Sequence, residues 1–316
     1  MFVTVKKINI AFLVVLSLLL YSCSRHDQAA APSPGAVRVD NILLLDAVQA
    51  GSRVIAAGER GQIIYSDDKG GTWKRARVPA QTTLTSLFFV DETHGWAAGH
   101  DSVILRTIDG GETWEQTHSA PKQEAPLLDI WFSDRTKGFA VGAYGQFYAT
   151  ADGGRTWKKK SAISDDMHIN AISGSGGGAI YLAGEAGALY RSGDGGASWQ
   201  RLASPYRGSF FGVLKLKTGG VLLYGLRGHL YRSDAGGASW RSLPTAGEAS
   251  LFGGSDADKG AVVLAGQDGT VLLSSDGGKT FRLKKQAGSK ALSAAVRVSD
   301  TELLLFGEAG VSRMDL

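Results

Sequence analysis

Cysteine is nearly absent from the sequence: Cys23 is the only one, so no disulfide can form within the chain. The six histidines show no spacing typical of metal ligands, and neither a metal nor another cofactor is expected. The sequence also lacks a large excess of positive or negative charge. If Lys6 and Lys7 are removed with the N-terminal segment described below, 34 − 2 = 32 basic residues face 30 acidic ones, a net charge of +2. This balance, without a long basic run, argues against a nucleic-acid partner.

Long apolar runs are missing too, with one exception at residues 8–22, "INIAFLVVLSLLLYS". This run follows two lysines, has the length of a signal-peptide core and is too short for a comfortable membrane span. It leads into Leu20-Tyr21-Ser22-Cys23, which resembles the bacterial lipobox, where the cysteine thiol is lipidated and becomes the first residue. We therefore predict a lipoprotein-type signal peptide over residues 1–22. The alternative is an ordinary signal peptide followed by an incidental cysteine.

The residues after Cys23 indicate where the mature protein is held. Ser24 occupies the position at which an aspartate would be the usual inner-membrane retention signal, which favours the outer membrane. Residues 24–36 are small and polar, as in a flexible tether. The sequence thus predicts an exported, periplasm-facing lipoprotein. Residues 23–35 are its lipidated cysteine and tether, and residues 36–316 are its folded domain.

Proline is scarce, with 7 residues, whereas glycine is abundant, with 43 of 316 residues or roughly twice average usage. Much of the glycine belongs to an internal repeat. A short pattern recurs at residues 66–73, 107–114, 150–157, 192–199, 233–240 and 274–281. Its copies end in Trp73, Trp114, Trp157, Trp199, Trp240 and Phe281, which are 41, 43, 42, 41 and 41 residues apart. A second marker runs in phase with the first, a glycine that ends an apolar strand at Gly58, Gly99, Gly142, Gly184, Gly225, Gly266 and Gly307.

Each period has the pattern of four short strands separated by turn residues. In the third period these are residues 126–134, 138–143, 145–152 and 155–161. Four strands in about 41 residues are typical of a propeller blade, so the seven markers predict an all-β, seven-bladed β-propeller. The seventh unit supplies only three strands before the chain ends. We expect residues 36–40, "AVRVD", to add its outer strand and close the ring.

The repeated pattern is the Asp box of BNR-type repeats, and its chemistry suits a tight turn between the third and fourth strands. A short acid at a turn can accept hydrogen bonds from backbone N–H groups a few residues on. The terminal aromatic can bury a large apolar area between blades. We therefore predict that these aromatics and the box acids, Asp68, Asp109, Asp152, Asp194 and Asp276, are structural. A catalytic set has no reason to recur six times, and Ala235 replaces the acid in the fifth copy.

Sialidases also carry Asp boxes, which makes the residues of the innermost strands candidates for catalysis. The repeat spacing predicts a ring of channel-lining residues, Leu45, Ser86, Asp129, Asn170, Phe211, Phe252 and Ser293. This ring contains one carboxylate and no basic residue, whereas glycoside hydrolysis needs a pair of carboxyl groups. No catalytic residue and no enzymatic activity are therefore predicted. A sialidase-like glycosidase or a glycan-binding propeller is the alternative.

Residues 127–157, "LLDIWFSDRTKGFAVGAYGQFYATADGGRTW", and their recurrence resemble one family across about residues 36–316. These are the photosystem II assembly and stability factor propellers of cyanobacteria and plants, and their bacterial relatives. The resemblance implies a non-enzymatic protein. Photosynthetic members bind a newly made reaction-centre protein, and other bacterial relatives tend to accompany RND-type exporters. We therefore expect a monomer whose partner is a membrane protein or membrane complex.

A partner surface is expected on the face opposite the Asp boxes, where the turns between the second and third strands (the 2–3 turns) should lie. These turns vary in sequence within a fixed frame, as a binding surface permits. The alternative is that they are only solvated turn residues. The candidate residues of this face are Arg60, His100, Tyr144, Glu185, Arg227, Asp268 and Glu308.

Overall fold

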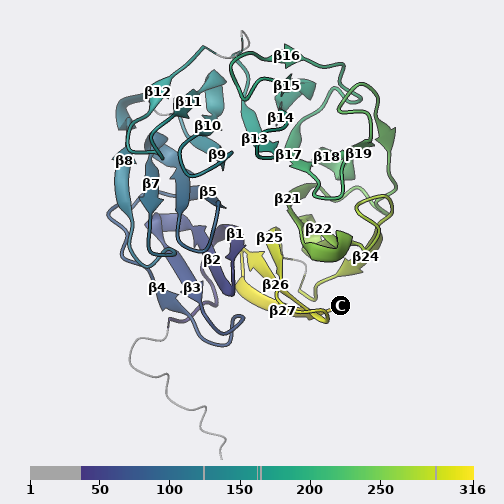
Figure 1. Cartoon of the computed structure of the whole chain (residues 1–316). Helices are drawn as coiled ribbons and strands as arrows, with labels where there is room; N and C mark the ends of the chain where they lie inside the picture. Colours follow the sequence, from purple (N-terminus) through teal and green to yellow (C-terminus); the bar gives the residue numbers. More distant parts are fainter. Residues whose placement is uncertain (1–36, 124, 162, 164–165, 289) are drawn as a thin grey trace, which may run out of the picture. The chain divides into compact units, whose positions relative to one another are not determined.

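The computed structural model describes residues 37–316 except 124, 162, 164–165 and 289. The predicted signal peptide, the lipidation site Cys23 and the tether lie outside these residues. Within the described part, no helix is long and apolar enough to cross a membrane. Seven antiparallel sheets are arranged as blades around a central channel (Figure 1), which confirms the predicted all-β, seven-bladed propeller.

Six of the blades have the four strands that the repeat predicts, and every strand pairs with its sequence neighbour. Blades one to three contain β1 (Leu44–Ala50), β2 (Arg53–Gly58), β3 (Ile63–Ser66) and β4 (Lys74–Arg75); β5 (Leu84–Phe89), β6 (Gly95–Gly99), β7 (Ile104–Thr107) and β8 (Glu115–His118); and β9 (Leu127–Phe132), β10 (Gly138–Gly142), β11 (Phe147–Thr150) and β12 (Lys158–Lys159). Blades four to six contain β13 (Ile169–Gly174), β14 (Ile180–Gly184), β15 (Leu189–Ser192) and β16 (Gln200–Arg201); β17 (Phe210–Lys215), β18 (Val221–Gly225), β19 (Leu230–Ser233) and β20 (Arg241–Ser242); and β21 (Leu251–Asp256), β22 (Val262–Gly266), β23 (Thr270–Ser274) and β24 (Arg282–Lys285).

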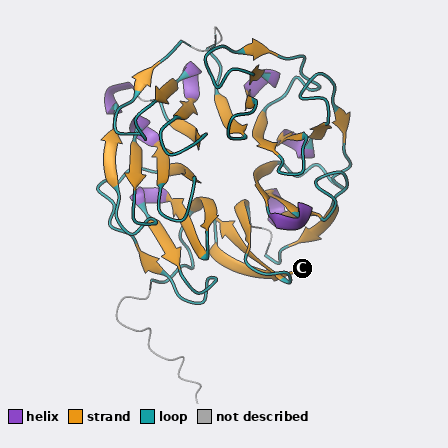
Figure 2. Cartoon of the chain, viewed as in Figure 1, coloured by secondary structure: helices purple, strands orange, loops and turns teal. Residues whose placement is uncertain are grey.

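The 2–3 turns of these six blades are short 3-10 turns, drawn among the purple segments of Figure 2. They are η1 (Glu59–Gly61), η2 (His100–Ser102), η4 (Ala143–Gly145), η5 (Glu185–Gly187), η6 (Leu226–Gly228) and η8 (Gln267–Gly269). Two other short 3-10 turns, η3 (Pro121–Gln123) and η7 (Asp258–Gly260), lie elsewhere in the chain.

The seventh blade has three strands, β25 (Leu292–Arg297), β26 (Glu302–Gly307) and β27 (Gly310–Asp315). The N-terminal segment does not form the predicted fourth strand. An isolated bridge joins Asp40 to Gly310, and the Val311 amide donates to the Val39 carbonyl at 3.1 Å. The amide of Val37 instead donates to Trp73 in the first blade. The segment therefore leaves β27 after one bridge and contacts both the first and the last blade.

The hydrophobic core is divided into clusters between neighbouring blades, and the Asp-box aromatics take part in it. Trp73 lies edge-on to Phe306 of the seventh blade, with ring centroids 6.0 Å apart. Trp199 meets Phe139 and Phe147 of the third blade in the same edge-on geometry. Each of these tryptophans thus joins its own blade to the preceding one, and burying so large a ring stabilises that junction.

Candidate functional site

The acids of the Asp boxes are fully engaged by their own turns. The Asp109 carboxylate accepts hydrogen bonds from the Thr107 hydroxyl at 2.8 Å, the Thr113 amide at 3.0 Å and the Thr113 hydroxyl at 2.5 Å. The Thr107 hydroxyl in turn accepts the Gly111 amide at 3.0 Å. The same set of bonds surrounds Asp68, Asp152, Asp194 and Asp276.

These hydrogen bonds stabilise the ionised carboxylates. Bonds from the Thr72 amide and hydroxyl lower the pKa of Asp68 to about 2, and bonds from the Thr156 hydroxyl and amide do the same for Asp152. A carboxylate held in this state accepts hydrogen bonds but has no proton to donate at neutral pH. Each box acid therefore acts as a turn clasp, a carboxylate that holds its own turn together by hydrogen bonds.

The Asp boxes also bind the preceding blade, a feature that sequence reasoning missed. A long donor side chain reaches across to a main-chain carbonyl of the box in five of the six copies. The pairs are Arg53 with Gly110 at 3.0 Å, Trp96 with Gly153 at 3.0 Å, Tyr181 with Gly236 at 3.2 Å, Arg232 with Gly277 at 2.5 Å and Arg313 with Lys69 at 3.0 Å. Trp96 and Tyr181 occupy equivalent positions in their second strands, and Arg232 and Arg313 occupy equivalent positions in their third strands. The repeat thus carries part of the signal for these contacts.

The central channel contains a cavity of about 970 Å³, lined by the inner strands of all seven blades. The predicted ring of channel residues has the wrong register. Asp46, Ser86 and Asp129 occupy equivalent places, each paired with the residue just before its marker glycine. The other members of this level are Ala171, Gly212, Gly253 and Ala294.

The register error has two causes in the chain. In the first blade Gly58 follows Leu44 by 14 residues, whereas Gly99 follows Leu84 by 15 in the second, so the first hairpin is one residue shorter. In addition, the predicted ring places Asn170 41 residues after Asp129, whereas the marker glycines of these two blades, Gly142 and Gly184, are 42 residues apart. The predicted residues Leu45, Asn170, Phe211, Phe252 and Ser293 therefore lie one place nearer the 2–3 turns than Asp129.

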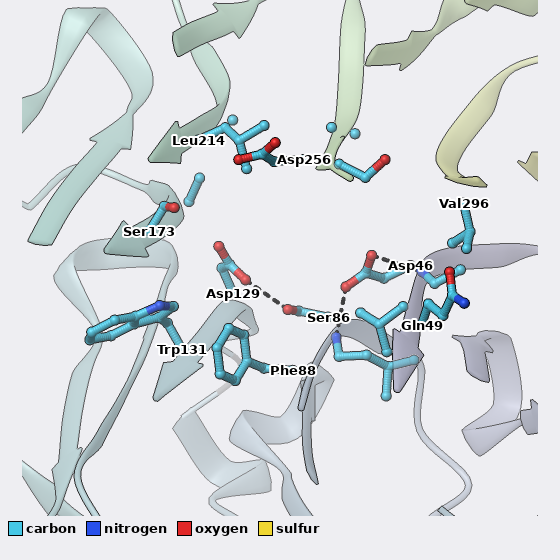
Figure 3. A pocket seen from close by; sticks show the side chains of 18 of the residues that line it. Asp46, Gln49, Ser86, Phe88, Asp129, Trp131, Ser173, Leu214, Asp256 and Val296 are labelled. Atoms are coloured by element: carbon cyan, nitrogen blue, oxygen red, sulfur yellow. Dashed lines mark hydrogen bonds between the residues drawn. The ribbon is translucent and has the colours of Figure 1, made fainter. Parts of the chain in front are cut away.

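The corrected level contains an acid pair that the sequence analysis excluded. Ser86 lies between Asp46 and Asp129, and its hydroxyl donates to Asp129 at 2.7 Å (Figure 3). Asp46 accepts the Leu87 amide at 2.7 Å, and Asp129 accepts the Ile172 amide at 2.8 Å. Asp46 thus joins the first blade to the second, and Asp129 joins the third blade to the second and the fourth.

The environment of the acid pair differs from that of the Asp boxes. Burial raises the pKa of Asp46 to about 7 and that of Asp129 to about 6, although backbone N–H groups oppose the shift. The charge of Asp129 adds to the shift at Asp46. Within the described part of the chain, no lysine, arginine or histidine forms an ion pair with either group.

Several of the predicted ring residues turn out to join blades. Asn170 and Ser293 each donate a hydrogen bond to the carbonyl that begins the next inner strand, at 2.7 and 2.6 Å. Thr85, which is not part of the predicted ring, donates in the same way at 2.8 Å. Phe211 and Phe252 instead form an aromatic pair at the channel wall, with ring centroids 5.6 Å apart. Phe252 is 36% exposed.

The candidate partner residues all lie in the 2–3 turns, as the sequence places them. The second residue of six of these turns has a left-handed backbone, with φ between 50° and 58°, and none of the six is glycine: Arg60, Asp101, Tyr144, Ala186, Arg227 and Asp268. Left-handed backbone is strained for residues that carry a Cβ. Tyr144 is 58% exposed there, and its ring meets His168 edge-on.

Two of the candidate residues also have local structural contacts. Glu185 accepts the His168 amide at 2.9 Å, and Glu308 accepts the Ala291 amide at 3.4 Å. Both acids thereby hold the segment that enters an inner strand, while His100, Arg227 and Asp268 are exposed. Among the described residues, no three His, Cys, Asp or Glu side chains are grouped as metal ligands.

Comparison with known proteins places this geometry in a family. The family model described as photosynthesis system II assembly factor YCF48 matches residues 66–126 and 117–253. The chain is similar to the photosystem II assembly protein Ycf48 of Thermosynechococcus vestitus, with 37% identity over 43 residues, 14% of this chain and 12% of that protein. It is also similar to the photosystem II assembly lipoprotein Ycf48 of Synechocystis sp., with 38% identity over 45 residues, 14% of this chain and 13% of that protein.

These sequence matches span less than a fifth of the length of the curated relatives. Solved structures share the fold over most of the chain. YCF48 bound to D1 peptide has a TM-score of 0.69 at 17% identity, covering 90% of this chain and 98% of that one. A GH74 enzyme of Niastella koreensis also has 0.69, at 15% identity, covering 88% of this chain and 53% of that one. Since the family model matches more than half of the sequence, the chain belongs to the photosystem II assembly factor YCF48 family.

Proposed function

We propose that this protein is a non-enzymatic propeller that binds a membrane protein through its 2–3 turns and assists the assembly or operation of that protein's complex. The observation that carries the proposal is the row of six strained, non-glycine residues in these turns. Glycine would remove the strain at each position. Keeping a side chain there at an energetic cost is typical of functional surfaces.

The relatives support this kind of partner. A YCF48 propeller was solved with a D1 peptide bound, and curated relatives are named as photosystem II assembly proteins. In a photosynthetic host we propose a photosystem protein as the partner, and in another host a component of an RND-type exporter. The varied charges of Arg60, Arg227 and Asp268, together with Tyr144, would then select the partner.

The membrane tether is part of the same proposal. A relative is named as a lipoprotein, and Cys23 follows an apolar export segment in this chain. A lipid at Cys23 and a tether over residues 23–35 would hold the propeller at the periplasmic surface, close to its partner. Ser24 favours the outer membrane, which membrane fractionation of cells expressing the full chain would test.

A glycosidase is the second candidate, because the channel holds two carboxyl groups and a GH74 enzyme shares the fold. The hydrogen bonds argue against it. Asp46 and Asp129 both accept main-chain amides from neighbouring blades, so they are already used as inter-blade contacts. Turnover of a fluorogenic sialoside that is lost in Asp129→Asn would instead establish the enzyme.

The partner face can be tested with two matched triple variants. In the first, Arg60, Tyr144 and Arg227 are replaced by alanine, which Ala186 shows is accommodated at this left-handed position. In the second, Ile108, Arg155 and Lys279 on the Asp-box turns are replaced, removing one large apolar and two basic side chains that are exposed as well. Membrane proteins that co-purify with the full chain should be lost from the first variant and kept by the second. Equal recovery with both variants would reject this surface.

A further inference from the structure

Among the residues that the structure describes, no basic side chain forms an ion pair with the acid pair of the channel. The basic residues that line the cavity, Lys215, Lys217, Lys259 and Arg297, come from the far ends of the inner strands or the turns beyond them. Asp46 and Asp129 lie near the beginnings of their strands. Both carboxylates are half-buried in the channel wall, and partly removing a carboxylate from water without pairing it is costly. A cation that enters from the near end would compensate both groups.

A tyrosine hydroxyl faces the same cavity. Tyr224 is 5% exposed and contributes to the cavity wall, and burial followed by the charges of Asp129 and Asp46 raises its pKa. Its ring passes where two neighbouring inner strands carry glycine. A Cβ at Gly212 would lie 2.0 Å from the Tyr224 ring, and one at Gly254 would lie 2.8 Å from the hydroxyl oxygen.

The Tyr224 hydroxyl makes no hydrogen bond to any residue in the described part of the chain. Its oxygen is not among the fully buried side-chain atoms of the described residues that lack a partner, so it is open to the channel. Two glycines therefore make room for a side chain whose polar end opens to the channel and has no hydrogen-bond partner among the described residues. A ligand in the channel would supply that partner.

The entrance nearest these groups is aromatic. Phe211 and Phe252 line the cavity one place closer to the 2–3 turns than Gly212 and Gly253, and their rings pair at 5.6 Å. Aromatic faces attract cations, most strongly where water is excluded. A cation passing from the 2–3 turn face to the acid pair would thus pass these rings.

We propose that this end of the channel binds a primary ammonium group, with Asp46, Asp129 and the Tyr224 hydroxyl oxygen as acceptors for its three N–H donors. A primary ammonium offers three donors and no acceptor, which matches this set of groups. The group can belong to a free alkylamine or to a lysine side chain of a bound peptide. The site goes beyond the proposed function, because it needs no contact with the variable turn residues.

The first test is calorimetric titration of the full chain, in detergent, with n-butylammonium and with its neutral counterpart n-pentanol. We expect n-butylammonium to bind and n-pentanol to bind at least tenfold more weakly. Asp129→Asn should weaken n-butylammonium binding by roughly tenfold or more, because it removes a charged acceptor. Tyr224→Phe should weaken it by about 2–10-fold, the range of a neutral hydrogen bond.

Tyr224→Phe is the more secure variant, since the hydroxyl makes no bond within the described protein and its loss should not affect folding. Asp300→Asn is the control. Asp300 also lines the cavity, but it comes from beyond the far end of β25 and its side chain is 76% exposed. This change should leave the affinity within about twofold. Equal binding of n-pentanol, equal binding by all variants, or no binding at about 50 mM n-butylammonium would overturn the site.

A second titration identifies the source of the ammonium group. The probes are a blocked Gly-Gly-Lys-Gly-Gly peptide and the same peptide with its lysine acetylated. At least tenfold tighter binding than n-butylammonium, abolished by acetylation, assigns the site to a lysine side chain. Affinity no better than that of n-butylammonium assigns it to a free amine. Since the 2–3 turn triple variant should bind n-butylammonium normally, failure of this site and failure of the partner face are distinguishable.

Discussion

Two sets of aspartates in this propeller show opposite behaviour. Those of the Asp boxes lie in exposed turns and accept several hydrogen bonds each, and the pKa of Asp68 and that of Asp152 fall to about 2. Asp46 and Asp129 lie inside the channel, where burial raises the pKa to about 7 and about 6. Aspartate is therefore ionised and stabilises a turn in the ring of Asp boxes, whereas it titrates near neutral pH in the ring of channel residues.

The two sets of aspartates also differ in how often they recur among the blades. The Asp boxes recur in six blades and carry the same bonds wherever the acid is present. The channel groups do not recur: acids stand in two blades, glycines in two others, and one tyrosine enters from a second strand. The repeated Asp-box residues stabilise the propeller fold, whereas the unrepeated channel residues are candidates for a function specific to this chain.

The largest effect is expected from the aromatic of an Asp box. Trp114 is 6% exposed, lies edge-on to Phe89 and packs in the cluster that holds Ile55 of the preceding blade. Trp114→Ala should lower the free energy of unfolding by about 3–5 kcal/mol, since it leaves a large cavity between blades. Denaturant unfolding measures this. A loss smaller than that of Asp109→Ala would contradict the assignment of the aromatics as the main inter-blade contacts.

The next effect concerns pH and the channel pair. Because the folded pKa values of Asp46 and Asp129 lie above the ordinary value near 3.8, the folded protein retains protons that the unfolded chain has lost. Their contribution to stability is full below about pH 4 and is lost as the pH rises to about 7, by an amount on the order of 3 kcal/mol for each carboxyl group. Replacing both by asparagine should flatten unfolding stability across this window.

In the same measurement, the Asp-box carboxylates should change the free energy of unfolding with pH in the opposite direction. Their lowered pKa values stabilise the protein above about pH 4, and this contribution is lost as the pH falls towards 2. The double asparagine variant should keep this acid loss unchanged. A pH profile that the double variant leaves unaltered between pH 4 and 7 would refute the difference between the two rings.

The smallest effects test single box acids. Asp109→Ala should cost about 1–3 kcal/mol, because it leaves the Thr113 amide and two hydroxyls without their acceptor. The fifth box supplies the reverse experiment, since Ala235 stands where the acid belongs. Ala235→Asp should raise the free energy of unfolding by roughly 1 kcal/mol. Chemical denaturation of both variants checks the pair, and destabilisation by Ala235→Asp would show that the box acid is not a general clasp.

The sequence is sufficient for the architecture because each blade repeats the same local chemistry. Strand order and the position of the Asp boxes follow from the spacing of Trp73 to Phe281, and the blade number follows from the seven marker glycines, Gly58 to Gly307. The closing strand is not predictable in this way, because the amide of Val37 bonds to Trp73 instead of continuing along β27. That choice depends on contacts between the two ends of the chain.

The channel is predicted only in part, for a related reason. A one-residue difference in the first hairpin hides Asp46 from an alignment based on the marker glycines. Aligning the inner strands on Leu44 and Leu84 would have found it. Tyr224 carries no such signal, because its access to the channel depends on Gly212 and on Gly254 of the next blade. Such a contact exists only in the folded protein.

The most direct test of the two-ring account is an NMR titration of the aspartate carboxyl carbons in the full chain, with and without n-butylammonium. We predict two aspartates that titrate near pH 6–7, are absent from the Asp46→Asn and Asp129→Asn double variant, and move to lower pKa when the amine binds. The Asp-box signals should titrate below their ordinary range and ignore the amine. Titration of all aspartates below pH 5, or two raised pKa values that the amine leaves unchanged, would contradict the account.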